Sequence, residues 1–145
     1  MAVVRDQPYT GQNFLVDLGD GQEAAFSEVS GLDSWIEVTE YRDGTDRTQN
    51  RRKIPSLTKV ADVTLKRGIT GNLNLYRWFD QVRNGDAASL RTVTITLLSE
   101  DRTPVLTWRL LRARPVGYGV APLDAGSCEV AVEELVLAYE RLELE

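Results

Sequence analysis

The residues of this chain that could perform acid–base chemistry are carboxylates, because the sequence contains 22 Asp and Glu but no histidine. The lack of histidine excludes Ser-His-Asp and Cys-His catalysis and removes the commonest side-chain ligand of transition metals. Glu133 and Glu134 are the most obvious carboxylate pair. Neighbouring residues of a strand point to opposite faces, so these two carboxylates cannot share a site without a bulge. The sequence therefore predicts a protein that is not an enzyme.

The thiol chemistry is equally limited. Cys128 is the only cysteine, so it cannot form an internal disulfide, and a single thiol makes no zinc cluster. We expect Cys128 to be a small buried apolar residue. The acidic residues follow neither an EF-hand loop nor a phosphate-binding Walker sequence. We therefore expect no metal and no cofactor.

The charged residues are distributed unevenly, which indicates a binding surface. Residues 17–40 contain seven acids and no Lys or Arg, whereas residues 41–53 carry a net charge of +3. The net charge of the whole chain is −5, which argues against a general nucleic-acid binder. Residues 42–53 also contain no apolar side chain, so this segment is predicted to be an extended polar loop outside the core.

Length and hydropathy predict a single domain over residues 1–145, which is long enough to bury its own core. No apolar run approaches the roughly 18 residues that cross a bilayer. The first residues lack the charged-then-apolar order of a signal peptide. We therefore expect synthesis in the cytoplasm without a signal peptide and no insertion into a membrane.

Alternating apolar residues predict a mainly β fold, with the first two strands forming a hairpin and Pro115 ending the sixth. The final segment also fits a helical stripe, but its β-branched residues favour a strand. Leu75, Phe79 and Val82 predict one helix over residues 72–84, capped by Thr70 or Asn72 and stopped at Gly85. The expected strands are 13–18, 23–29, 35–41, 60–67, 91–99, 105–114 and 128–142.

These elements predict two packed antiparallel sheets or an open β-barrel with one flanking helix. The long strands have few edge-blocking prolines, which favours edges that pair with other copies of the chain. An alternative is a small β-barrel that binds an apolar ligand, with Trp35, Trp78 and Trp108 lining its pocket.

Seven short segments, in order over nearly the whole chain, form a recognisable pattern. They are Asn-Phe-Leu-Val at 13–16, Phe-Ser-Glu-Val-Ser-Gly-Leu at 26–32, Glu-Tyr-Arg-Asp-Gly at 40–44, Lys-Ile-Pro at 53–55, Val-Thr-Leu-Lys-Arg-Gly at 63–68, Tyr-Arg-Trp at 76–78 and Glu-Val-Ala-Val-Glu-Glu-Leu at 129–135. The pattern resembles the tail tube proteins of contractile phage tails and phage-like contractile injection systems. Ser56 and Arg141 depart from it, where the family often has glycine.

The resemblance implies a structural protein, six copies of which form a ring whose sheets join into a continuous barrel. Stacked rings would make a hollow tube for DNA or protein cargo, surrounded by a sheath protein and bounded by baseplate and tube-terminating proteins. The polar loop 42–53 matches the extended loop by which such subunits reach their neighbours. A type VI secretion tube protein, similar in fold, is the alternative within this class.

Combined with the charge distribution, the resemblance gives a hypothesis for how copies recognise each other. Head-to-tail contacts join two different surfaces, which must therefore be complementary. We expect the basic loop of one copy to meet the acidic residues of another. The basic residues are Arg42, Arg47, Arg51, Arg52 and Lys53, and the acidic residues are Glu28, Asp33, Glu37 and Glu40.

Overall fold

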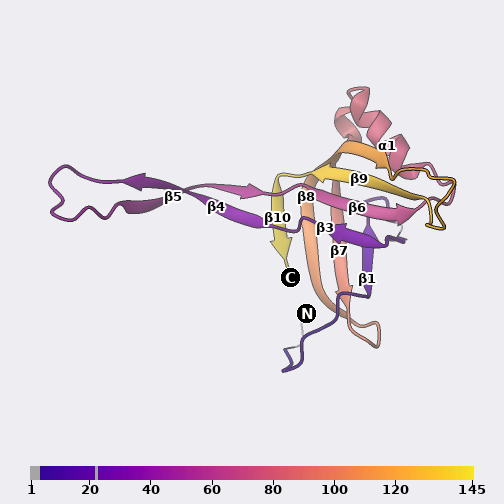
Figure 1. The fold of residues 1–145 in the computed structure, drawn as a ribbon, viewed down its shortest axis with the longest axis horizontal. Helices are drawn as coiled ribbons and strands as arrows, with labels where there is room; N and C mark the ends of the chain where they lie inside the picture. The colour runs from indigo at the N-terminus through magenta and orange to yellow at the C-terminus, as the bar shows by residue number, and fades with distance from the viewer. Residues whose placement is uncertain (1–3, 22) are drawn as a thin grey trace.

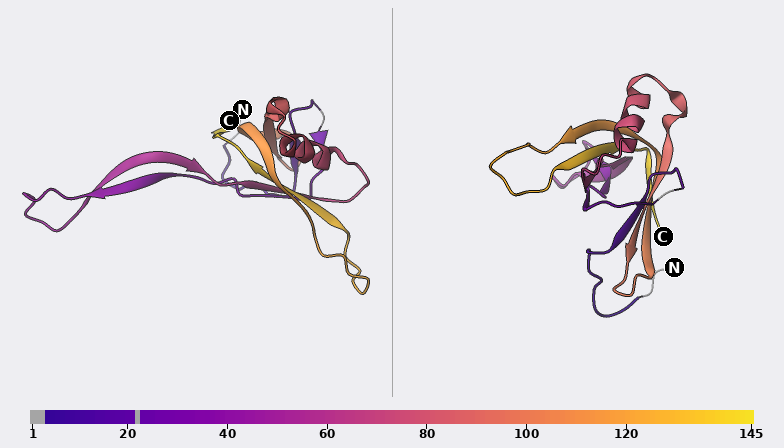
Figure 2. Two further views of the ribbon diagram at one scale, coloured as in Figure 1. Left: turned by 90° about the horizontal axis from the view of Figure 1, so that it is seen from above. Right: turned by 90° about the vertical axis from the view of Figure 1, so that its right-hand side faces the viewer.

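The computed structural model describes residues 4–21 and 23–145, which form a β-rich body with one helix and a long two-stranded arm (Figure 1). The arm extends far from the body, and a loop projects from the opposite end (Figure 2). The strands are β1 (Phe14–Asp17), β2 (Glu23–Ala24), β3 (Glu28–Ser30), β4 (Ser34–Tyr41), β5 (Arg52–Val60), β6 (Val63–Gly68), β7 (Arg91–Leu98), β8 (Pro104–Val120), β9 (Val132–Ala138) and β10 (Arg141–Leu144). The helices are α1 (Asn74–Arg83) and the short 3₁₀ helix η1 (Ala87–Ser89).

Two antiparallel sheets share strand β8, which confirms the predicted fold class in its two-sheet form, since the strands do not close into a barrel. Sheet A has the order β2-β1-β7-β8-β10, and sheet B has the order β8-β9-β6-β3. The core lies between these sheets and under α1. Its buried members include Val16, Leu65, Leu110 and Leu137.

Strand β8 is longer than predicted, because Pro115 does not end it. The pairing of β8 changes from β7 to β9 around Ala113 and Arg114, and its register with β9 shifts between Pro115 and Gly117. Proline lacks a backbone donor and is tolerated in a strand at such an irregularity. The side chain of Pro115 is also fully buried, so burial favours the residue at this position.

Three other predicted strands differ in their bounds. Segment 23–29 is split between β2, which pairs with β1, and β3, which pairs with β6, so the expected hairpin is only two residues deep. The predicted strand 60–67 is interrupted at 61–62, where the Ala61 amide donates to the Asp33 carbonyl at 3.0 Å. The last segment is a strand, as predicted, but it comprises β9 and β10 and begins only at Val132.

Gly31 fixes the point where the arm leaves the body. Its φ of +90° lies in the left-handed region, and a Cβ built there would stand 2.2 Å from the Asp62 carbonyl oxygen. Only glycine allows this close approach of the two backbones. Gly31 therefore lets β3 turn into β4 directly beside the start of β6.

Helix α1 lies where it was predicted, but its buried face differs. Leu75 and Trp78 are its buried residues, whereas Phe79 and Val82 are only half-buried. The Trp78 indole donates to the Ser89 carbonyl at 2.7 Å, which satisfies its polar atom inside the core. Neither Thr70 nor Asn72 is the N-cap residue; that position is Leu73, without a side-chain cap. Gly85, with φ +82°, follows the end of the helix as predicted.

Candidate assembly surfaces

The arm is formed by β4 and β5, which pair with each other and with no other described strand. An isolated two-stranded hairpin is at best marginally stable in water, because neither of its faces is covered. Apolar side chains are nevertheless exposed along its length. They are Trp35, Ile36, Val38, Tyr41, Ile54 and Leu57. Such a row of exposed apolar residues indicates a surface that another protein chain covers.

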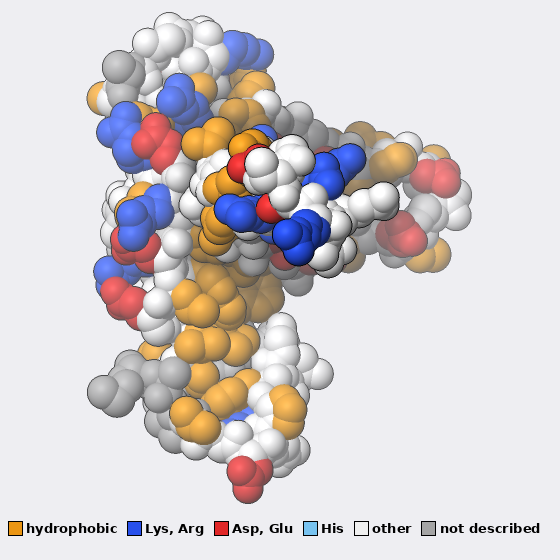
Figure 3. All heavy atoms as spheres, turned by 90° about the vertical axis from the view of Figure 1, so that its left-hand side faces the viewer, with side chains coloured by type: hydrophobic (Ala, Val, Ile, Leu, Met, Phe, Trp, Pro, Cys, Tyr) orange, Lys and Arg blue, Asp and Glu red, His pale blue; other side chains and the backbone are white. Residues whose placement is uncertain are grey.

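The polar tip of the arm is shorter than predicted, since Arg52 and Lys53 lie in β5 and only residues 42–51 form the loop. Arg42 stabilises this loop from within, donating from Nε to the Thr48 carbonyl and from Nη2 to the Asp46 carbonyl. Arg51 pairs with Glu40 at 3.2 Å and Arg52 approaches Asp46 at 3.8 Å. Viewed end-on, the tip carries several cationic side chains (Figure 3).

Two of the five basic residues, Arg47 and Lys53, make no ion pair with any residue that the structure describes. Both are exposed. Exposed and uncompensated cations are available to a partner without the cost of breaking an existing pair.

The four predicted acidic residues do not form one block. Glu28 lies in β3 and pairs with Lys66 at 3.3 Å, and Glu40 pairs with Arg51 near the tip. Glu37 lies between the Trp35 indole and Lys59, which together hold the pKa of its carboxyl below the ordinary value. Asp33, at the base of the arm, has no ion pair within the described chain. Most of this acidic charge is therefore already compensated inside one copy.

Sheet A ends in two open edges. Strand β10 pairs with β8 on one side only, and β2 covers only Val16 and Asp17 of β1. At the β10 edge, Glu145 and Thr107 exchange both backbone hydrogen bonds at 2.9 Å. Pairing alternates along an antiparallel ladder, so the N–H of the preceding residue, Leu144, points to the open side. These edges have donors and acceptors available for a further strand.

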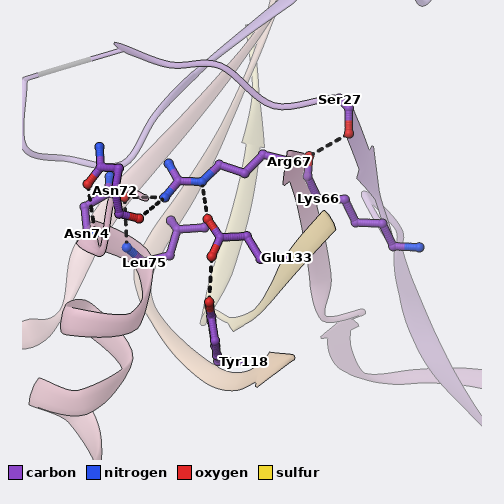
Figure 4. A network of polar contacts seen from close by, with 8 residues as sticks. All are labelled: Ser27, Lys66, Arg67, Asn72, Asn74, Leu75, Tyr118 and Glu133. Atoms are coloured by element: carbon purple, nitrogen blue, oxygen red, sulfur yellow. Dashed lines mark hydrogen bonds and ion pairs between the residues drawn. The ribbon is translucent and has the colours of Figure 1, made fainter. Parts of the chain in front are cut away.

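A buried polar network joins three strands of sheet B to the start of α1 (Figure 4). Arg67 in β6 donates from Nε to Glu133 in β9 at 2.6 Å, and both side chains are almost fully buried. The Nη2 of Arg67 donates to the Asn72 carbonyl at 3.0 Å and to Asn74 Oδ1 at 2.6 Å. The Tyr118 hydroxyl of β8 donates to the other Glu133 oxygen at 2.6 Å. One ion pair thus connects three strands and the helix.

This network was missed from the sequence, although a signal for it was present. Arg67 continues the alternation of Val63 and Leu65, and Glu133 stands in the same register as Leu135 and Leu137. A cation and an acid at core positions of two strands indicate a buried pair, because buried charges are retained when they are paired.

The Tyr118–Glu133 hydrogen bond, together with burial, raises the pKa of Tyr118 to about 12 from its usual 10.0. The folded state therefore holds this proton more tightly than the unfolded state. Its contribution to stability is fully present below pH 10 and is lost as the pH rises from about 10 to about 12. We expect the free energy of unfolding, measured by urea titration, to fall in this window.

The Tyr118→Phe variant tests the assignment. It lacks the titrating phenol, so its free energy of unfolding should fall less between pH 10 and 12 than that of the unmodified protein. Burial also raises the pKa of Tyr139, so Tyr139→Phe is measured in parallel to determine how much of the fall comes from this second phenol. A decline in Tyr118→Phe as steep as in the unmodified protein would show that this hydrogen bond does not cause the effect.

The comparisons with known proteins identify the family. A model of the family described as "T4-like virus tail tube protein gp19" matches residues 10–143. The chain belongs to this tail tube protein family. Its fold agrees with a chain of the anti-feeding prophage baseplate at a TM-score of 0.85 and 29% identity, over 97% of both chains. It agrees with a chain of an extracellular contractile injection system, the PVC sheath–tube complex, at a TM-score of 0.86 and 29% identity, over 97% of this chain and 93% of that one.

Solved structures with lower sequence identity to this chain support only its fold. Hcp1 from Flavobacterium johnsoniae matches the tail tube protein with a TM-score of 0.56 and 14% identity, over 90% of this chain and 93% of that chain. No curated protein matches at a significant level. The match to the tail tube family covers most of the chain, so the tail tube assignment holds over the type VI secretion tube protein.

In the tail tube protein, the two carboxylates and the three tryptophans considered from the sequence do not come together in one site. Glu133 and Glu134 point to opposite faces of β9, as predicted, because Glu133 is buried with Arg67 while Glu134 is half-exposed. Trp35 lies on the arm, whereas Trp78 is a buried residue of α1 and Trp108 lies in sheet A. The three tryptophans therefore do not line one pocket.

Cys128 is exposed in the loop between β8 and β9, so the prediction that it is buried was wrong. That loop contains a Gly and several small residues and lies outside both sheets, which leaves the thiol exposed to solvent. Within the part of the chain that the structure describes, no helix is long and apolar enough to cross a membrane.

Proposed function

We propose that this tail tube protein forms the inner tube of a contractile, phage-tail-like particle, as rings of six copies that stack into a hollow conduit for DNA or protein cargo. The observation that carries the proposal is sheet A, which has an open edge at β10 and, on the opposite side, an edge at β1 that the two-residue strand β2 covers only in part. Pairing the β10 edge of one copy with the β1 edge of the next is a heterologous contact, and such contacts close into rings when the rotation between copies allows it.

The similar structures support this assembly. The anti-feeding prophage baseplate contains a similar chain in an assembly with sixfold symmetry, and the PVC relative occurs in a sheath–tube complex. Further similar chains come from the cap of the anti-feeding prophage and from a PVC sheath/tube terminator. We therefore propose a sheath protein, baseplate proteins and a tube terminator as partners, synthesis in the cytoplasm without a signal peptide, and no catalytic activity.

The arm gives each copy a second means of reaching its neighbours. Its exposed apolar residues and its basic tip lie outside the body, on the β10 side of sheet A (Figure 1). We propose that contact with other copies covers this surface, and that the basic residues predicted from the sequence contribute charge to the contact. Arg47 and Lys53 carry the largest share of that role, since Arg42, Arg51 and Arg52 already have acceptors within their own copy.

Electron microscopy of the purified protein tests the proposal. We expect rings or stacked hollow tubes in negative stain when the protein is concentrated, with longer tubes at low salt, because exposed charge pairs are screened by salt. A protein that stays monomeric at every concentration and salt tested would contradict the proposal.

A further inference from the structure

The loop that connects β8 to β9, residues 121–131, exposes apolar side chains on the body. Leu123 is 78% exposed and Val130 is 75% exposed. The two sides of the loop, residues 121–125 and 127–132, line an open hollow of about 730 Å³. Its lining is mainly small and apolar, with Ala121, Pro122, Ala125 and Ala131 beside the two larger residues. An apolar hollow on an exposed loop is a docking surface for which the free subunit has no partner.

This region of the chain carries acidic residues but no basic ones. Residues 115–139 contain no Lys or Arg, and the loop itself carries Asp124 and Glu129. Neither carboxylate forms an ion pair with a residue that the structure describes. Viewed along the arm, the part of the molecule that projects to the right shows orange and red side chains, whereas blue ones lie at the arm tip and along the opposite side of the molecule (Figure 3).

The arm tip has the complementary properties. Its cations without an ion pair are Arg47 in the tip loop and Lys53 at the start of β5, and they equal in number the unpaired acids of the β8–β9 loop. Ile54 and Leu57 of β5 add exposed apolar surface. Asp33 is the one residue of the predicted acidic set without an ion pair, and it lies at the base of the arm rather than in an acidic patch. The β8–β9 loop is therefore a better acceptor for the tip than residues 28–40.

The arm tip and the β8–β9 loop of one copy lie too far apart to meet, so a contact between them must join two copies. The arm and the β8–β9 loop lie at opposite ends of the long axis of the molecule, the arm beyond the β10 edge and the loop toward the β1 side (Figures 1 and 2). When the β10 edge of one copy meets the β1 edge of the next, the arm of the first points toward the second. The β8–β9 loop of the second copy lies on the side of that copy that faces the first.

We propose that the β8–β9 loop receives the basic arm tip of the neighbouring copy in the same ring. Leu123 and Val130 of the loop cover apolar residues of the arm, and Asp124 and Glu129 neutralise Arg47 and Lys53. The contact rests on the proposed ring assembly and names the surface that the arm occupies in it. A second copy is the occupant because arm and loop are complementary in both charge and hydropathy and lie at opposite ends of one chain.

Site-directed cross-linking tests the contact, because Cys128 is the only thiol and is exposed in the loop. A second cysteine is introduced at the arm tip by Gln49→Cys, and the assembled protein is treated with a short bismaleimide. We expect a ladder of covalent dimers up to hexamers on denaturing gels. The ladder should disappear in Gln49→Cys combined with Cys128→Ser, which excludes cross-links between two arms. Asp101→Cys, at the β7–β8 turn, is the matched control and should give at least tenfold less product.

Electron microscopy of the same samples tests the arm–loop contact separately from the proposed tube function. Rings without the Cys128-dependent ladder would overturn the arm–loop contact and leave the tube function standing. Samples without rings, in which no ladder forms, would overturn both. Rings with the ladder in Gln49→Cys but not in Asp101→Cys would support the contact.

A charge exchange supplies an independent readout. Arg47→Glu with Lys53→Glu should raise the protein concentration needed for ring formation at least tenfold, because like charges then face each other. Adding Asp124→Lys and Glu129→Lys to the same chain should restore most of the loss. Arg77→Glu with Arg114→Glu makes the same change of net charge elsewhere on the surface and should have little effect. If the variant with all four substitutions folds normally but still needs the higher protein concentration to form rings, the contact is contradicted.

Discussion

The Arg67→Ala variant is expected to lose about 3–5 kcal/mol of unfolding free energy, which is the cost of removing one partner from a buried ion pair. The loss arises because Glu133, only 4% exposed, keeps its charge in the core without its cation. The same substitution removes the donor to the Asn72 carbonyl and to Asn74, so the start of α1 loses its link to β6. Urea denaturation followed by tryptophan fluorescence and circular dichroism measures the loss.

Lys66→Ala is the matched control for this prediction. Lys66 precedes Arg67 in β6 and pairs with Glu28 at 3.3 Å, but this pair is exposed to solvent. Exposed pairs contribute about 0–1 kcal/mol, so the control should change stability little. An Arg67→Ala variant no less stable than Lys66→Ala would show that the network contributes nothing specific. Replacing both partners, in Arg67→Met with Glu133→Leu, should recover much of the loss, since no charge is then left unpaired.

The sequence predicts the elements whose patterns are local. The strand at 91–99 and helix α1 were placed within about two residues, because alternation and a helical stripe depend on neighbours in the chain alone. The arm strands were also foreseen in part, as a strand ending at Tyr41 and a polar loop after it. What the pattern could not show is that β4 and β5 leave the body, since exposed residues such as Ile36 and Leu57 are apolar like those of a core.

The features that the sequence did not predict depend on contacts between residues far apart in the chain. The continuation of β8 past Pro115 depends on its change of partner from β7 to β9, which no local pattern encodes. The charge hypothesis was incomplete for a related reason: Lys59 and Lys66 follow the basic loop in sequence, but strand pairing places them beside Glu37 and Glu28. Identifying the charges that remain for a partner therefore requires the pairing of β3, β4, β5 and β6.

Blocking the open edge of β10 is expected to prevent assembly. In Leu144→Pro the backbone donor that faces the open side is replaced by a ring, while the bonds between Glu145 and Thr107 are retained. A neighbouring strand can then neither receive that hydrogen bond nor approach closely. Each lost hydrogen bond is worth roughly 0.5–1.5 kcal/mol, which lowers the association constant of a junction up to about tenfold, and a ring of six contains six such junctions.

We therefore expect Leu144→Pro to remain monomeric in sedimentation velocity and electron microscopy at concentrations at which the unmodified protein forms rings. Leu144→Ala removes the same exposed side chain but keeps the N–H, so it should still assemble. Urea denaturation of both variants distinguishes an assembly defect from a folding defect, because a substitution at an exposed position of an edge strand should reduce the stability of the free subunit little. Normal rings of Leu144→Pro would show that copies do not join through β10, and the ring contact would then have to be made by the arm alone.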